Sequence, residues 1–361
     1  MEVSLNEIGE IITGNTPSKS DTNFWNSPDI CFIKPDVIAE DEITELLDSN
    51  EYISENARNK ARIVNKNSIL VTCIGSIAKI GIVKIRECAF NQQINAIIPN
   101  KNIDTKYLCY CLQNSKVKLK AIANAPVVPI INKKQFGEFV VKIDSDISTQ
   151  KKIVNRLDYI QSVITLYKIQ LQKFDDLIKA RFVEMFGTPY GNEKGFPMMT
   201  VDDVIEFTGG AQPDKKYFEY EATADNIRLI QIRDYKTDSY VTYIPRSMAK
   251  RFCNADDIMI GRYGPPIFQI LKGIEGAYNV ALMKATPKRG NKEFIRYFLK
   301  QDCLFTYLDK LSQRTAGQSG IEMPALKAYP FPYPPVELQE QFADFVQQVD
   351  KSKYDDMYIR D

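Results

Sequence analysis

A regular apolar pattern marks the middle of the chain. Apolar side chains recur there at alternating steps of four and three residues, at Ile153, Leu157, Ile160, Ile164, Tyr167, Leu171, Phe174 and Ile178. This a/d spacing predicts one long helix with a coiled-coil seam. Ser148 or Thr149 would cap its start, and Gly187 followed by Pro189 would end it. Such a helix would be a rod of roughly 60 Å, which is longer than a small domain is wide.

A related but shorter pattern stands near the end of the chain. Its apolar positions are Phe342, Val346 and Val349, and they correspond to Ile153, Leu157 and Ile160. The pattern then stops, because Lys353 and Asp356 stand where the first helix has Ile164 and Tyr167. A helix with an apolar seam needs a partner, so we expect these two helices to pair. We also expect the second helix to be cut short or replaced after Val349.

The segments that precede these two helices resemble each other. Residues 3–17 align without a gap on residues 199–213, which places Gly14 on Gly210 and Pro17 on Pro213. Further matches follow in the same order: 29–33 with 226–230, 65–71 with 254–260, 90–91 with 278–279, and 107–110 with 294–297. One fold used twice explains this order better than chance.

Each copy mixes strand and helix patterns. β-Branched runs at 68–74 and 257–260 predict strands, and residues 78–85 alternate in part like another strand. Helical periodicity marks residues 104–119 and 292–311. Each copy is therefore expected to be an α+β domain. The predicted division is a first domain over 1–147, a helix over 148–187, a second domain over 188–335 and a helical segment over 336–361.

Composition mainly excludes functions. The chain of 361 residues has no histidine, which removes the Ser-His-Asp triad, the Cys-His pair and any His-ligated zinc. Lys and Arg (47) nearly balance Asp and Glu (46), so bulk charge does not favour nucleic acid, although local basic patches remain possible. Seven cysteines without a C-x-x-C pair predict reduced, mostly buried thiols in a cytoplasmic protein and no metal site. We find neither a signal peptide nor the roughly 20-residue apolar run that a membrane span needs.

Four motifs in a fixed order carry a family resemblance. They are the Ile-Thr-Gly-Asn-Thr-Pro start (Ile12–Pro17), the Met-Phe-Gly-x-Pro end of the central helix (Met185–Pro189), the Leu-Ile-Gln-Ile-Arg-Asp strand (Leu229–Asp234) and the Phe-Pro-Tyr-Pro-Pro exit (Phe331–Pro335). None is strong alone. Together with the duplication, they resemble the specificity subunit of type I restriction-modification systems over nearly the whole chain.

This resemblance implies a specific architecture. The two copies would be pseudo-symmetric target recognition domains, each reading one half of a split sequence in double-stranded DNA. The two helices would pair antiparallel as a coiled coil and set the spacer between the half-sites. Two modification (methyltransferase) subunits and restriction subunits would be the protein partners. These partners would bind S-adenosylmethionine, ATP and Mg, whereas this chain would bind no cofactor and catalyse nothing.

The motifs that are missing agree with that expectation, and two alternatives stay open. No phosphate-binding G-x-x-x-x-G-K-[ST] loop occurs, and Gly264-Pro265-Pro266-Ile267 lacks the Asn and the aromatic residue of an adenine methyltransferase motif. One alternative is a shortened specificity protein that acts as a scaffold or self-associates. The other is the recognition part of a single-chain DNA methyltransferase.

Candidate DNA contacts follow from residue chemistry. Arg reads guanine, Asn or Gln reads adenine, and Lys, Arg and hydroxyl groups bind phosphates. The candidates in the first domain are Asn15, Thr16, Ser18, Lys19, Arg58, Lys60, Arg62, Gln92 and Gln93. Those in the second are Lys215, Lys216, Arg233, Lys250, Arg251, Arg262, Tyr263, Gln313, Arg314 and Gln318. For each cluster a merely solvated surface is the alternative. We expect Lys60 and Arg62 to contact phosphates and Arg262 to read a base.

Overall fold

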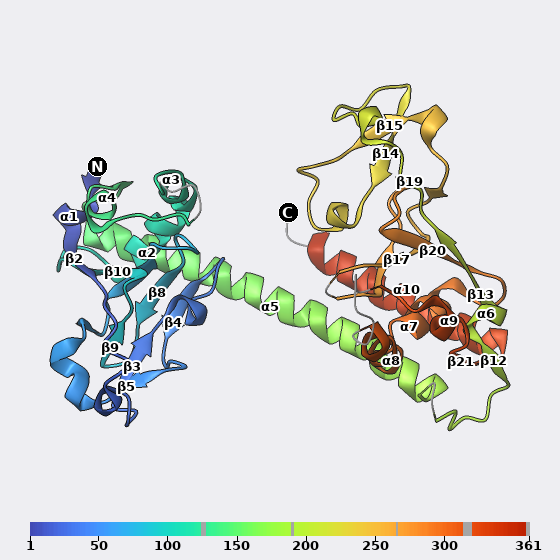
Figure 1. The fold of residues 1–361 in the computed structure, drawn as a ribbon, viewed down its shortest axis with the longest axis horizontal. Helices are drawn as coiled ribbons and strands as arrows, with labels where there is room; N and C mark the ends of the chain where they lie inside the picture. Colours follow the sequence, from blue (N-terminus) through green and yellow to red (C-terminus); the bar gives the residue numbers. More distant parts are fainter. Residues whose placement is uncertain (124–127, 189–190, 265, 313–319, 359–361) are drawn as a thin grey trace. The chain divides into compact units, whose positions relative to one another are not determined.

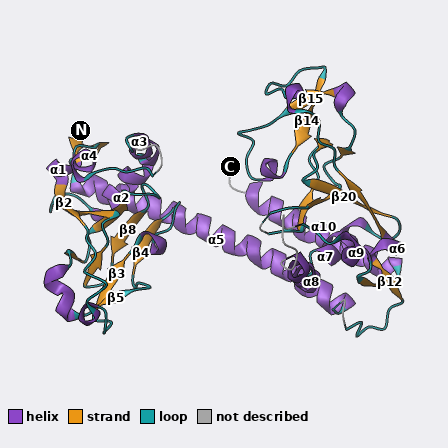
Figure 2. Ribbon diagram, viewed as in Figure 1, coloured by secondary structure: helices purple, strands orange, loops and turns teal. Residues whose placement is uncertain are grey.

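The computed structural model describes residues 1–123, 128–188, 191–264, 266–312 and 320–358 (Figure 1). It separates into two compact units, residues 1–166 and 167–361. The boundary lies inside the long helix α5 (Ile147–Phe186), so each unit includes part of that helix. Both units combine helices and sheets, and the predicted α+β class is confirmed (Figure 2).

The first unit contains two larger sheets and one short ladder. The five-stranded sheet has the order β2 (Gly9–Thr13), β10 (Ile94–Pro99), β7 (Ile69–Thr72), β8 (Ile80–Val83), β4 (Ile43–Leu46). The four-stranded sheet has the order β5 (Tyr52–Ile53), β3 (Ile30–Ile33), β9 (Glu87–Phe90), β6 (Ile63–Asn65). The ladder pairs β1 (Glu2–Ser4) with β11 (Val140–Lys142). Helices and 3₁₀ turns complete the unit: α1 (Leu5–Ile8), α2 (Thr105–Asn114), α3 (Lys116–Ala121), α4 (Lys133–Gly137), η1 (Thr22–Phe24), η2 (Pro35–Val37) and η3 (Glu55–Lys60).

The second unit has the same plan. One sheet has the order β13 (Ile205–Gly209), β20 (Leu282–Pro287), β17 (Ile258–Gly261), β18 (Gln269–Lys272). The other has the order β15 (Tyr243–Pro245), β14 (Asn226–Ile230), β19 (Gly276–Tyr278), β16 (Phe252–Cys253), and the ladder pairs β12 (Met198–Thr200) with β21 (Pro330–Pro332). The helices and 3₁₀ turns are α6 (Val201–Val204), α7 (Lys292–Leu299), α8 (Asp302–Ser312), α9 (Met323–Lys327), α10 (Val336–Tyr358), η4 (Lys215–Tyr217), η5 (Ile232–Tyr235) and η6 (Arg246–Met248).

The two units match strand for strand. The order β2-β10-β7-β8 corresponds to β13-β20-β17-β18, and β5-β3-β9-β6 corresponds to β15-β14-β19-β16. Within the second pair of sheets, β3–β9 and β14–β19 are both parallel, and the neighbouring pairs are antiparallel in both units. Among the described residues of the second unit, no strand corresponds to β4. The duplication predicted from the sequence is therefore present in the fold.

Each predicted helix after the sheets is in fact two helices. The first turns at Ser115, between α2 and α3, and the second turns at Lys300 and Gln301, between α7 and α8. Periodicity alone misses the breaks because the apolar residues on both sides are buried against the same core, as Leu112 and Leu119 are. In the part of the chain that the structure describes, each hydrophobic cluster is built from residues of one unit.

The start of α5 differs from the prediction, whereas its end agrees. The cap is Asp146, whose carboxylate accepts the N–H groups of Ser148 (3.1 Å) and Thr149 (3.0 Å). Ser148 and Thr149 are therefore inside the first turn, because an aspartate one residue before Ile147 already satisfies the free N–H groups. The Thr149 hydroxyl and these N–H groups lower the pKa of Asp146. At the other end, Gly187 has φ 70° and its N–H bonds to the Val183 carbonyl, as expected for a glycine that ends a helix.

Within the second unit, α10 packs antiparallel against the end of α5 (Figure 1). Phe342, near the start of α10, contacts Phe182 and Phe186 with ring centroids 5.3 and 5.6 Å away. Further along α10, Lys353 reaches back to Asp175 at 2.8 Å. The predicted seam residues Ile178, Val346 and Val349 are buried there, next to the partly buried Phe174.

The rest of the predicted seam is not covered. Ile153 and Leu157 are half-buried, but Ile160 is 52% exposed, Ile164 42% and Leu171 40%. The helix pairing is therefore short, in agreement with the early end of the second apolar pattern. The pairing covers only the part of α5 that lies beside the second core, and it extends through Phe182 and Phe186, beyond the predicted seam.

One glutamine joins each helix to its own unit. Gln150 at the base of α5 and Gln339 at the base of α10 are both fully buried. The Gln150 side chain accepts the N–H of Asp104, which caps α2, and the Gln339 side chain accepts the N–H of Asn291, which caps α7 (2.8 Å each). Both amides also donate to a carbonyl just before their own helix. The two helices thus begin at the same kind of hydrogen-bonded joint.

Candidate nucleic-acid interface

The Gly-x-x-Pro turn of each repeat closes against the loop that follows β9 or β19. Gly14 and Gly210 donate their N–H groups to the carbonyls of Ile94 and Leu282. A Cβ atom on Gly14 would lie 2.2 Å from the carbonyl oxygen of Asn91, and one on Gly210 would lie 1.9 Å from that of Asn279. Because only glycine permits this approach, its presence in both turns is a packing requirement.

In the first unit this turn gathers candidates from three parts of the sequence. Asn15 donates its amide to the Lys60 carbonyl and accepts the N–H of Arg62, both at 2.6 Å. Thr16 donates its hydroxyl to the side-chain oxygen of Gln92 at 2.7 Å. The three clusters predicted separately therefore form one surface, which we call the first reading face: Asn15, Thr16, Lys60, Arg62 and Gln92.

A groove of about 590 Å³ adjoins this face. The groove is lined by Arg62, Ile63, residues 10–13 and Lys133, among others. Lys133 was not a sequence candidate, because it is far from the other residues along the chain and belongs to a short helix. No signal in the sequence pattern could have found it.

Around the corresponding turn of the second unit, we group Gln212, Lys250, Arg251, Arg262 and Tyr263 as the second reading face. Arg262 follows β17, and its guanidinium lies over the Tyr263 ring at 5.2 Å. One of its nitrogens, Nη1, donates to the Val280 carbonyl at 3.4 Å. Gln212 and Lys250 line a smaller cavity of about 230 Å³ between the turn and the segment before β16.

Arg62 and Arg251 occupy the same position in the two units. Ile63 pairs with Ala89 in the β6–β9 ladder, and Phe252 pairs with Ala277 in the β16–β19 ladder. Each arginine directly precedes the paired residue, and both are exposed. The register thus places one solvent-facing arginine beside each Gly-x-x-Pro turn.

Other basic candidates are already partnered inside the protein. Arg58 forms ion pairs with Glu55 and Glu87, and its guanidinium lowers the pKa of the Glu87 carboxyl. Lys19 lies over the Trp25 ring, and Lys216 pairs with Asp214 at 3.3 Å. Lys19 also lies 3.9 Å from Glu51, so all three side chains have an acidic neighbour that reduces the charge they offer to a phosphate.

The remaining candidates fall into three groups. The Ser18 hydroxyl bonds to that of Ser20. The Gln93 side-chain oxygen accepts the Asn91 amide, and the Gln93 N–H donates to the Asn91 side-chain oxygen, so both residues stabilise local turns. Lys215 is exposed, and Arg233 bonds to Thr242 away from the second reading face, beside the exposed rings of Tyr220 and Tyr240. Gln313, Arg314 and Gln318 lie outside the described residues.

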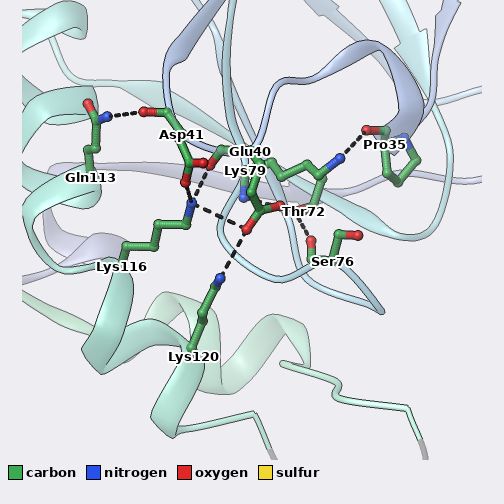
Figure 3. A network of polar contacts seen from close by, with 9 residues as sticks. All are labelled: Pro35, Glu40, Asp41, Thr72, Ser76, Lys79, Gln113, Lys116 and Lys120. Carbon is green, nitrogen blue, oxygen red and sulfur yellow. Dashed lines mark hydrogen bonds and ion pairs between the residues drawn. The ribbon is translucent and has the colours of Figure 1, made fainter. Parts of the chain in front are cut away.

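In a polar network on the first unit, further basic side chains are paired with carboxylates. Lys116 and Lys120 of α3 both reach Glu40, and Lys116 also pairs with Asp41 at 3.2 Å (Figure 3). Gln113 donates to the Asp41 carbonyl in the same network (Figure 3). Gln113 and these two lysines hold α2 and α3 to the loop between η2 and β4, and the ion pairs reduce the charge that Lys116 and Lys120 offer to a phosphate.

The described residues offer neither a metal site nor a membrane span. Over the described part of the chain, no cluster of three or more Cys, Asp or Glu side chains could hold a metal ion. No helix in those segments is long and apolar enough to cross a membrane.

Comparison with known proteins identifies the family. Residues 1–173 and 193–355 both match the sequence model of the type I restriction modification DNA specificity domain. The specificity subunit of the type I restriction enzyme EcoR124I/EcoR124II of Escherichia coli is 31% identical over 43% of this chain and 39% of its own length. That of the MjaIX enzyme of Methanocaldococcus jannaschii is 25% identical over 65% of this chain.

The chain spans less than two thirds of the length of these two relatives, 39% and 62%. A crystal structure of a type I restriction-modification system S subunit from M. genitalium shares the fold, with a TM-score of 0.53 at 12% identity, over 98% of this chain and 90% of that one. The chain therefore belongs to the family of type I restriction-modification DNA specificity domains and carries two of these domains in tandem.

Proposed function

We propose that this chain is the non-catalytic specificity subunit of a type I restriction-modification complex, with one reading face for each half of a bipartite DNA target. The observation that carries the proposal is the repeated placement of Arg62 and Arg251 beside the same turn. Two copies of one surface suit a split site, because duplex DNA has local two-fold axes that a duplicated protein can match. The net charge of +1 also suits a subunit that makes few phosphate contacts of its own.

The exposed middle of α5 supports docking of partner subunits. Besides the open seam, Leu166 is 64% exposed and Ile169 48%. On a helix, residues 166 and 169 lie away from the a/d seam, so apolar surface is presented on more than one side. Such a helix fits between helices of other chains, and we assign this surface to two modification subunits in the cytoplasm. Those subunits and the restriction subunits would bind S-adenosylmethionine, ATP and Mg.

Methylome sequencing of cells that express this chain with its modification subunit tests the proposal. We expect one bipartite methylated motif that depends on this chain. A cell without the chain, but with the modification subunit, is the control. Methylation that persists unchanged in the control would overturn the specificity role, and S-adenosylmethionine binding to the isolated chain would support a single-chain methyltransferase instead.

A second candidate function is self-association through the same helix, and the open seam at Ile160, Ile164 and Leu171 favours it. Native mass spectrometry distinguishes these two candidate functions. One copy of this chain with two modification subunits supports the specificity subunit. A stable dimer of this chain that excludes those subunits supports the scaffold.

A further inference from the structure

We propose that the two units read different bases at one structurally equivalent place: Gln92 reads an adenine in one half-site, and Arg262 reads a guanine in the other. This inference rests on the proposed function, since it assigns the base contacts of the two reading faces. Gln92 lies in the turn after β9 and Arg262 follows β17, so sequence alignment does not pair them.

The two places are equivalent because the same hydrogen bonds build them. Asn91 and Asn279 are buried and donate their N–H groups to the carbonyls of Ile33 and Ile230 (3.1 and 3.0 Å). Their side-chain oxygens accept the N–H two residues further on, at 3.1 Å in both units. The next residue after each asparagine is Gln92 in the first unit and Val280 in the second.

In the first unit this place carries an oriented amide. Gln92 is exposed, and its side-chain oxygen accepts the Thr16 hydroxyl. The oxygen has a second lone pair, and within the described residues the NH₂ group has no hydrogen-bond partner. An amide held in one orientation can accept from adenine N6 and donate to adenine N7. Gln93 is less suited, because it is partly buried and its side-chain oxygen accepts the amide of the buried Asn91.

In the second unit the place carries a guanidinium. Val280 offers no polar side chain, and Arg262 reaches over it through the bond from Nη1 to the Val280 carbonyl. Tyr263 and this bond orient the group, and no described residue accepts from Nε or Nη2. An arginine fork of this kind suits guanine O6 and N7. The aligned residue of the first unit is Cys73, which is buried and cannot take this role.

Arg62 and Arg251 provide the matched contrast. They are the same residue type at the same register, so they make the same contact in both half-sites. We therefore assign both arginines to phosphate contacts, which position the protein without specifying a base. The reading faces thus separate into a shared phosphate arginine and a base reader that differs between the units.

The test is methylome sequencing of the complex with four single variants. We expect Gln92→Ala and Arg262→Ala each to make one position degenerate, in different half-sites, with at least tenfold lower discrimination there. We expect Arg62→Ala and Arg251→Ala to lower methylation at all sites and leave the motif unchanged. Arg262→Gln should change the preferred base at its position from guanine to adenine.

Several outcomes would overturn the assignment. They are an unchanged motif in Gln92→Ala or Arg262→Ala while methylation persists, degeneracy of both variants in the same half-site, or loss of guanine preference in Arg62→Ala. Thermal melting of each variant complex reports folding separately. If the unaltered chain directs no bipartite motif, the proposed function fails, which is a different result from a motif that ignores these two side chains.

Discussion

Gly210 shows how a single residue type can be required by a close backbone contact. Its neighbour Gly209 provides the comparison, because a Cβ there would meet only Arg262, at 3.6 Å. The two adjacent glycines therefore differ in what they tolerate, although both lie in one stretch of sequence. In a sequence the pair Gly209-Gly210 looks like one flexible turn.

We expect Gly210→Ala to destabilise the second unit by roughly 3 kcal/mol, because the new methyl group meets a backbone carbonyl that cannot move aside easily. Gly209→Ala should change stability by less than about 0.5 kcal/mol. Urea denaturation of the two variants measures the difference. Equal stability of Gly210→Ala and the unaltered chain would contradict the close approach.

The cysteines are a second test at this scale. All seven are free thiols; Cys73, Cys88, Cys109 and Cys253 are buried, and the other three are partly buried. Burial raises the pKa of Cys73 and Cys88 to about 12 and that of Cys253 to about 11. Since the thiolate is the reactive form, these thiols should resist alkylation at pH 8 in the folded protein. Mass spectrometry after iodoacetamide treatment should find them labelled only once urea is present, and labelling of Cys88 in buffer would contradict this.

At the scale of elements, α5 has three different environments along its length. Its start packs on the first core, its end packs on the second core and α10, and its middle is open. A heptad pattern reports that a face is apolar and does not report what covers it. This is why the sequence correctly predicts the helix, whereas the structure decides which parts of its apolar face are covered.

We expect Ile164→Asp and Leu171→Asp to leave the melting temperature of the isolated chain nearly unchanged, because both side chains are about 40% exposed. The same variants should weaken assembly with the modification subunits by at least tenfold, since a charge would enter an apolar contact. Thr165→Asp on the polar side of α5 is the matched control. Titration followed by native mass spectrometry measures assembly, and full assembly of Ile164→Asp would show that the seam is not the docking surface.

At the scale of the whole molecule, the duplication produces two units with separate hydrophobic clusters. Because each cluster of described residues belongs to one unit, we expect two unfolding transitions in calorimetry. Phe342→Ala removes a buried ring that contacts Phe182 and Phe186, which should destabilise the second unit by about 3–5 kcal/mol. Gly14→Ala should lower the temperature of the transition in which the first unit unfolds.

Each substitution should therefore move one transition and leave the other in place. A single transition that both substitutions shift would mean that the two units unfold together. Calorimetry at two scan rates separates such coupling from a slow, irreversible step.

Sequence by itself determined what depends on local periodicity and order along the chain: the duplication, the long central helix, its glycine end and the family. The sequence identifies candidate DNA contacts only by residue type, so it does not distinguish Arg58 from Lys60. Only the tertiary structure decided that Arg58 is paired with Glu87, and that Asn15, Arg62 and Gln92 meet on one face. The physical reason is that charge compensation and hydrogen bonding join residues far apart in sequence, and no periodicity records them. The equivalence of Gln92 and Arg262 likewise emerges from strand register and the loops built on Asn91 and Asn279.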